Sequence, residues 1–346
     1  MGEQDPTRLL VLAPNWLGDV VMALPALADL RKRFADATLV VAARRGLGPI
    51  FECVPGVDQI VLLDGRHDVD TLRQAGADAV LLLPNSFRSA WLTWRAGVPV
   101  RWGYRTQMRD LLLTQTFVPP RLRRRHHATY YQHLTTSLGC EAGPLRVRLQ
   151  HAGAAETAGA RVLEAAGWKG ERLVGIAPGA ANGTAKQWHP DRMAQVAAQL
   201  ITDHGVSVAI LGSSGDKPAA REVVERVEAS RVPSGRVHNL AGRTSLIELI
   251  GVTTRCAAFL SNDSGAMHLA SALDVPVVAV FGPTREWATS PLPGPSGREA
   301  TVLTQDVFCR PCMLRTCPID HRCMTRIDVQ RVLNAVVAQL AAGAAS

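Results

Sequence analysis

The chain has 346 residues, of which 47% are hydrophobic and only 5% aromatic, and its formal net charge is +8. This length predicts two domains, and an apolar fraction rich in Ala, Val and Leu favours an α/β protein over an all-β one. No apolar run reaches the roughly 20 residues of a membrane span, and no leader pattern opens the chain, so we expect a cytoplasmic protein with an anionic partner.

Apolar runs alternate with helical patterns in the first half, which predicts a parallel sheet built in βαβ steps. The expected strands cover residues 8–13, 38–42, 59–63 and 79–83, and a helix is expected over 20–34. Asp19 lies at the start of this helix, where it is either an N-cap or a carboxylate near a ligand. Neither Gly-x-Gly-x-x-Gly nor a Walker sequence occurs here, which argues against dinucleotide-dependent redox chemistry and NTP hydrolysis.

Arginines crowd the segment from residue 101 to 127, where the single acid is Asp110. Such a segment is either a solvated face or a surface for an acceptor that carries carboxylates or phosphates. No nucleic-acid-binding motif supports a nucleic acid partner, so none is expected. The arginines are Arg101, Arg105, Arg109, Arg121, Arg123, Arg124 and Arg125.

A second βαβ series follows a weakly periodic connection between residues 140 and 172. Its expected strands cover 173–177, 206–211, 237–240, 257–260 and 275–281, and a terminal amphipathic helix is expected over 328–342, packing across the domains. We therefore predict domains at 1–155 and 156–330, then a helix and tail at 331–346. Two doubly wound domains facing a central cleft suit an enzyme that joins two substrates.

Two polar loops follow strands of this second series. One contains Thr184 and Lys186, and the other reads Asp263-Ser264-Gly265 at the start of a helical pattern. A helix N-terminus beyond a parallel strand is suited to bind an anion, and a lysine is suited to a phosphate. The alternative is a capped turn beside a flexible surface loop, but two such loops at one sheet edge favour a phosphate-bearing ligand.

Four cysteines with His321 between them form a dense cluster near the C-terminus, spaced Cys-x2-Cys-x4-Cys-x5-Cys. The cluster is either a structural zinc site or a group of reduced or locally disulfide-bonded thiols, because its spacing differs from a standard pair of Cys-x2-Cys motifs. The zinc candidates are Cys309, Cys312, Cys317 and Cys323.

Four motifs together resemble the ADP-heptose:lipopolysaccharide heptosyltransferases of glycosyltransferase family 9, and most of all heptosyltransferase II. They are NWLGDVVM at 15–22, LPNSFRSA at 83–90, PGA at 178–180 with AKQW at 185–188, and SNDSGAMH at 261–268. The resemblance spans residues 8–335. It implies the GT-B fold and inverting, metal-independent transfer of L-glycero-D-manno-heptose from ADP-heptose to the heptose/Kdo inner core on lipid A, at the inner face of the inner membrane.

The resemblance also implies roles for single residues and no cofactor beyond the donor. Asp19 would be the catalytic base and Lys186 would hold the diphosphate; the donor would be bound by Thr184, Asp263, Ser264, Gly265, Met267 and His268. The acceptor would be bound by Asn85, Ser86, Arg88, Arg105 and Arg109. The alternatives are a heptosyltransferase of type I or III, another GT-B nucleotide-sugar transferase or epimerase, and a nucleotide- or polyanion-binding module without catalysis.

Overall fold

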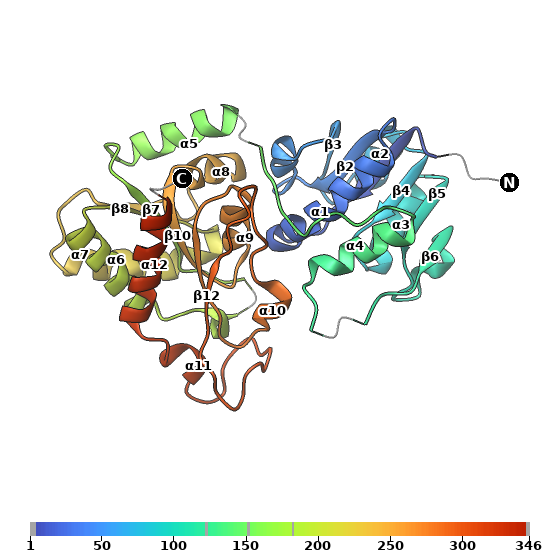
Figure 1. Cartoon of the computed structure of the whole chain (residues 1–346). Helices are drawn as coiled ribbons and strands as arrows, with labels where there is room; N and C mark the ends of the chain where they lie inside the picture. Colours follow the sequence, from blue (N-terminus) through green and yellow to red (C-terminus); the bar gives the residue numbers. More distant parts are fainter. Residues whose placement is uncertain (1–4, 122–123, 151–152, 182, 344–346) are drawn as a thin grey trace. The chain divides into compact units, whose positions relative to one another are not determined.

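The computed structural model describes residues 5–121, 124–150, 153–181 and 183–343. The chain divides into two compact units, residues 1–150 and 151–346, each with its own parallel sheet (Figure 1). The predicted α/β architecture with two doubly wound domains is confirmed.

The first unit has, in its described part, a six-stranded parallel sheet of order β3-β2-β1-β4-β5-β6. The strand order reverses between β1 and β4, so the carboxyl ends of these strands form the switch point at which open α/β sheets bind ligands. The strands are β1 (Arg8–Leu12), β2 (Thr38–Arg44), β3 (Gln59–Leu63), β4 (Ala79–Leu82), β5 (Val100–Tyr104) and β6 (Gln115–Phe117). The helices are α1 (Leu17–Arg33), α2 (Asp68–Gln74), α3 (Phe87–Arg95) and α4 (Ala128–Ser137), with 3₁₀ turns η1 (Gly48–Cys53) and η2 (Arg109–Leu111).

The second unit repeats this topology, with a described sheet of order β12-β11-β10-β7-β8-β9 and its own switch point between β7 and β10. Its strands are β7 (Leu173–Ala177), β8 (Ser207–Ile210), β9 (Val237–Asn239), β10 (Cys256–Asn262), β11 (Val277–Val280) and β12 (Thr301–Leu303). Its helices are α5 (Gly153–Ala165), α6 (Pro190–His204), α7 (Lys217–Ala229), α8 (Leu246–Thr253), α9 (Gly265–Ala272), α10 (Glu286–Thr289), α11 (Arg322–Thr325) and α12 (Val329–Gly343), with 3₁₀ turns η3 (Thr184–Lys186) and η4 (Ser214–Asp216).

The central strands of both sheets are buried, as expected where helices cover the two faces of a parallel sheet. Leu10 of β1 pairs in register with Val80 of β4, and both belong to the core of the first unit. In the second unit α12 packs on α6 and on the strands β10 and β11, and it buries Val332 and Val336 (Figure 1). The helix predicted at the C-terminus is thus present.

A close contact of two helices in the second unit depends on glycine. A Cβ atom on Gly159 of α5 would lie 2.2 Å from the Gly251 carbonyl carbon in α8, and one on Gly251 would lie 1.8 Å from the Ala155 oxygen. The two backbones therefore touch without intervening side chains, and α5 is held against α8.

Three of the described strands, β5, β6 and β12, were not predicted from the sequence. Arg101 and Gly103 interrupt the apolar pattern of β5, while β6 and β12 have only three residues each, too few to show a periodicity. Helix α1 also begins at Leu17, earlier than predicted, with Trp16 at the N-cap position. Asp19 consequently lies in the first turn of the helix, and its interpretation as an N-cap was wrong.

Candidate functional site

The first part of the site is Asp19, which follows β1 at the switch point of the first sheet. Its side chain is 30% exposed, and its position in the first turn of α1 is one at which the helix dipole favours a carboxylate. The backbone turns from β1 into α1 through Pro14, Asn15 and Trp16. The carboxylate is therefore held at the edge of the sheet with access to solvent.

Two side chains of the α4 region contact Asp19, because α4 packs against α1. His127 Nε2 lies 3.8 Å from Asp19 Oδ1, and the buried Tyr131 hydroxyl is hydrogen-bonded to the same carboxylate. Burial lowers the pKa of His127 from its usual 6.5, and the charge of Asp19 opposes this shift. Burial, followed by the charge of Asp19, raises the pKa of Tyr131 well above 10. Tyr131 therefore remains a hydrogen-bond donor to Asp19 at neutral pH.

Asp19 opens into a cavity of about 310 Å³ whose wall includes His127, Tyr130, Tyr131 and Asn85. A second cavity of about 300 Å³ lies over the ends of β1, β2 and β4, and Asn15, Pro84 and Ser86 line both. The two cavities therefore adjoin at the carboxyl edge of the sheet, and together they could hold an extended polar ligand next to Asp19.

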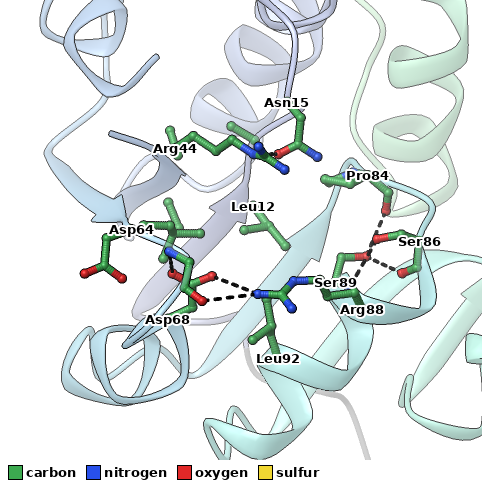
Figure 2. A pocket seen from close by; sticks show the side chains of 15 residues that line it. Leu12, Asn15, Arg44, Asp64, Asp68, Pro84, Ser86, Arg88, Ser89 and Leu92 are labelled. Carbon is green, nitrogen blue, oxygen red and sulfur yellow. Dashed lines mark hydrogen bonds and ion pairs between the residues drawn. The ribbon is translucent and has the colours of Figure 1, made fainter. Parts of the chain in front are cut away.

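The second cavity has charged walls (Figure 2). Arg88 points toward the buried Asp68, with 3.6 Å between Nη2 and Oδ2, and from the opposite wall Arg44 Nε donates to Asn15 Oδ1 over 2.6 Å. Ser86 caps α3 by accepting a hydrogen bond from the Ser89 N–H. Two guanidinium groups and the carboxylates of Asp64 and Asp68 thus surround a space that suits sugar hydroxyls.

Arg109 is not positioned as the sequence predicted. Its side chain is fully buried, Nε donates to the Tyr104 oxygen over 2.8 Å, and the guanidinium also contacts the Pro84 oxygen and Asn85 Oδ1. Burial lowers the pKa of Arg109 to about 10, so the group remains charged. Direct contact with an acceptor is therefore wrong for Arg109, because its donors are used to fix the loop after β4.

The other residues predicted to bind the acceptor do not all line the two cavities. Asn85 donates from Nδ2 to the Tyr130 hydroxyl over 2.7 Å, and it lines the cavity next to Asp19. Arg105 follows β5, is exposed, and is not among the lining residues of either cavity. Arg101 in β5 donates to carbonyl groups of adjoining loops, for example to the Leu112 oxygen over 2.6 Å, and Arg123 lies outside the described residues.

The second part of the site lies at the switch point of the second sheet. Lys186 at the end of η3 forms an ion pair with Asp263 after β10, with 2.8 Å between Nζ and Oδ2. Ser264 is at the N-cap position of α9 but its side chain forms no cap, which contradicts the interpretation of this turn as a simple capped one. The lysine charge and the N-terminus of α9 follow two adjacent strands, and both favour an anion.

Asn262 holds the two loops of this site together. Its Oδ1 accepts from the Trp188 N–H over 2.9 Å, and its Nδ2 donates to the Pro178 oxygen over 2.8 Å. A Cβ atom on Gly179 would lie 1.9 Å from Asp216 Oδ1, so this loop requires glycine. The loop after β7 is therefore fixed by the last residue of β10, although Asn182 within it lies outside the described residues.

The other three predicted donor residues are placed differently. Met267 is fully buried, and His268 is 4% exposed, about as buried as Asp263 at 5%. Thr184 is exposed but lines another cavity, of about 460 Å³, together with Pro218, Cys317 and other residues. The two loops therefore bring together a group of four predicted residues, Lys186, Asp263, Ser264 and Gly265.

The cysteine cluster had two interpretations from the sequence, a structural zinc site or a group of thiols. Among the residues that the structure describes, no group of three or more His, Cys, Asp and Glu side chains is placed to hold a metal ion, and the cysteines are free thiols. Cys323 is buried, Cys312 is exposed, and His321 Nε2 is bonded to the Ala185 oxygen at 2.6 Å. Since the Ala185 N–H also donates to the Arg315 oxygen over 3.0 Å, this segment supports the loop that carries Lys186.

Sequence reasoning missed the partners of Asp19. His127 lies at the end of the arginine-rich segment, and neither His127 nor Tyr131 was among the predicted site residues. Their spacing of four residues places them on one face of a helix, which is the signal that could have found them. No pattern in the sequence indicated that this face contacts α1.

Two doubly wound units with polar switch points define the architecture of GT-B glycosyltransferases. The structure of ADP-heptose lipopolysaccharide heptosyltransferase II from E. coli matches with a TM-score of 0.80 and 28% identity, over 97% of this chain and 99% of that one. The match confirms the GT-B fold.

Sequence comparisons identify the family. The model of glycosyltransferase family 9 (heptosyltransferase) matches residues 68–322. Lipopolysaccharide heptosyltransferase 2 of Escherichia coli K12 is 31% identical over 82% of this chain and 85% of its own length, and lipooligosaccharide heptosyltransferase 2 of Haemophilus influenzae is 29% identical over 82% and 86%. The chain belongs to glycosyltransferase family 9 and is a glycosyltransferase. None of its described helices has the length and apolar character needed to cross a bilayer.

Proposed function

We propose that this enzyme transfers L-glycero-D-manno-heptose from ADP-heptose to the heptose/Kdo inner core of lipopolysaccharide, as a heptosyltransferase of type II. Its membership of family 9 and its relatives named heptosyltransferase 2 support the substrate class. The structural observation that carries the proposal is the Asp19 carboxylate, which opens into a polar cavity at the switch point of the first sheet.

The donor would bind to the second unit. Lys186 and the N–H groups at the start of α9 would hold the diphosphate, because both offer positive charge at the ends of β7 and β10. Asp263 would accept hydrogen bonds from hydroxyl groups of the donor sugar. As the bond to the sugar breaks, negative charge grows on the departing ADP, and Lys186 would stabilise it. The reaction proposed here is metal-independent, because these groups supply that stabilisation.

Asp19 would be the base. An acceptor hydroxyl attacks the anomeric carbon from the face opposite ADP, its proton passes to the Asp19 carboxylate, and the configuration inverts. Tyr131 and His127 would be positioning residues, since both contact the carboxylate from α4 and its N-terminal flank. A neutral His127 next to the base would leave the carboxylate available to accept the proton.

The acceptor would occupy the two adjoining cavities of the first unit. Arg88 and Arg44 suit the carboxylate and phosphate groups of an inner-core oligosaccharide, and Ser86 lines both cavities. Asn85 lies next to Asp19 and would contact the reacting sugar, while Arg109 fixes Asn85 from the interior. Because such an acceptor is anchored by lipid A, we place the enzyme in the cytoplasm, at the inner face of the inner membrane.

The test is transfer by the Asp19→Asn variant, measured with ADP-heptose and inner-core acceptors that carry zero, one or two heptoses. The expected rate is lower by about 10³-fold, the range over which general bases contribute, while ADP affinity stays unchanged. Asp191→Asn is the matched control, since Asp191 also lies in the first turn of a helix. Wild-type turnover by Asp19→Asn would refute the assignment of the base. Conversion of the donor without any acceptor would instead indicate an epimerase.

A further inference from the structure

Helix α3 of the first unit, labelled in Figure 1, has exposed aromatic side chains along one side. Phe87, Trp91 and Trp94 are 46%, 38% and 48% exposed, and their spacing of four and three residues aligns them along one side. Ala90 and Thr93 of the same helix are fully buried against the unit. A surface helix usually presents polar residues to water, so an exposed aromatic stripe indicates an interaction surface.

The other exposed side chains of α3 are basic. Arg88 and Arg95 lie beside the stripe, and the guanidinium carbon of Arg95 is 5.7 Å from the centre of the Trp91 ring. Arg73 of α2 lies at this end, where its Nη2 donates to the Arg95 oxygen over 3.0 Å. Two acids of α2 pair with these arginines, Asp70 with Arg73 and Asp68 with Arg88. The sequence of α3 itself contains no acidic residue, so Arg95 supplies positive charge next to the stripe.

Turn η2 contacts α3, and two further exposed apolar side chains lie in this turn and just before it, Leu111 at 87% and Met108 at 80%. Aromatic side chains are enriched where a protein meets the headgroup region of a bilayer, and arginines nearby bind lipid phosphates. Arg95 and the net charge of +8 complement an anionic lipid surface, which favours a bilayer over a second copy of this basic chain.

We propose that the α3 docking face, defined as Phe87, Trp91 and Trp94 with Arg95, binds the surface of an anionic lipid bilayer. The choice of a bilayer rests in part on the proposed function, in which the acceptor is anchored by lipid. The N-terminal end of α3 supplies Ser86 and Arg88 to the acceptor cavity. Docking through this helix would therefore bring that cavity to the lipid surface.

The test measures sedimentation of the full-length protein with vesicles of phosphatidylethanolamine and phosphatidylglycerol, and with vesicles of phosphatidylcholine alone. The double variant Trp91→Ser/Trp94→Ser is expected to bind the anionic vesicles about tenfold or more weakly, since two half-exposed indole rings lose their apolar contact. Arg95→Glu should remove the preference for anionic vesicles. Phe308→Ser is the matched control, because Phe308 is 79% exposed in the second unit, and it should bind like the wild type.

Equal binding by the double variant and the wild type would overturn the proposal, as would an equal loss in Phe308→Ser. Sedimentation velocity in which the wild type self-associates through Trp91 and Trp94 would also overturn it, because the face would then bind a second copy. Transfer to a soluble, lipid-free acceptor oligosaccharide separates the two proposals. The double variant should keep this activity. If the wild type does not bind vesicles but transfers heptose to the soluble acceptor, only the docking proposal fails. If the wild type binds vesicles through Trp91 and Trp94 but transfers no heptose, only the proposed function fails.

Discussion

Replacement of Lys186 by methionine tests how much the ion pair between Lys186 and Asp263 contributes to stability. In the wild type Lys186 Nζ lies 2.8 Å from Asp263 Oδ2, and the Asp263 side chain is only 6% exposed. Removing one partner of a buried ion pair typically costs 3–5 kcal/mol, because the other charge is left uncompensated. Lys186 is 23% exposed, so water would enter in its place, and we expect a smaller loss of about 2 kcal/mol.

Thermal unfolding of the protein without ligand gives the measurement. For a unit of this size, about 2 kcal/mol corresponds to a fall in Tm of about 6 °C. Asp263→Asn should lower the Tm less, because the remaining lysine can reach water. In the Lys186→Met/Asp263→Asn double variant the isolated charge is gone, so most of the lost stability should return.

ADP affinity separates stability from function in the same variants. It should fall in both variants that lack Lys186, including the double variant whose stability has returned, because the cation proposed to hold the diphosphate is absent. A double variant that is as unstable as Lys186→Met would refute the argument from uncompensated charge. Unchanged ADP affinity in the double variant would remove Lys186 from the donor site.

Gly251→Ala should destabilise the second unit by about 1–3 kcal/mol, because its Cβ would overlap the Ala155 oxygen. Gly153→Ala, at the open start of α5, is the control and should leave the stability unchanged. Differential scanning calorimetry measures the Tm of both variants. Arg109→Met should slow transfer and raise the KM for the acceptor, without changing ADP affinity, because the loop after β4 loses its internal donors. Burial lowers the pKa of His127 in the folded protein, so the unfolded chain binds this proton more readily. The free energy of unfolding should therefore fall as the pH drops below about 6.5. The fall should be smaller in His127→Gln.

Each of these three predictions would be contradicted by one particular result. Equal Tm values for Gly251→Ala and the wild type would mean that α5 and α8 are not held in close contact. Unchanged acceptor kinetics in Arg109→Met would show that the loop is stable without its buried arginine. Parallel pH-stability curves for His127→Gln and the wild type would show that His127 titrates alike in the folded and unfolded chain.

Much of the sheet architecture follows from local sequence patterns. Apolar runs bounded by polar turns predicted nine of the twelve described strands, and two have the predicted bounds, β3 and β7. The residue types after β1, β7 and β10 then indicated where ligand-binding loops lie, because the ends of parallel strands share one edge. Lys186 and Asp263 were grouped for this reason, and the structure places them in contact.

The sequence by itself determined the order of strands and helices and the loops at the switch points, because period and turn residues are local properties of the chain. Only the tertiary structure decided which polar groups face a ligand. Arg109 lies in the interior and Met267 on the buried side of α9, while His127 contacts Asp19 from the start of α4, far away in the sequence. Such contacts depend on how helices pack across a sheet, and no local pattern encodes the partner of a buried face.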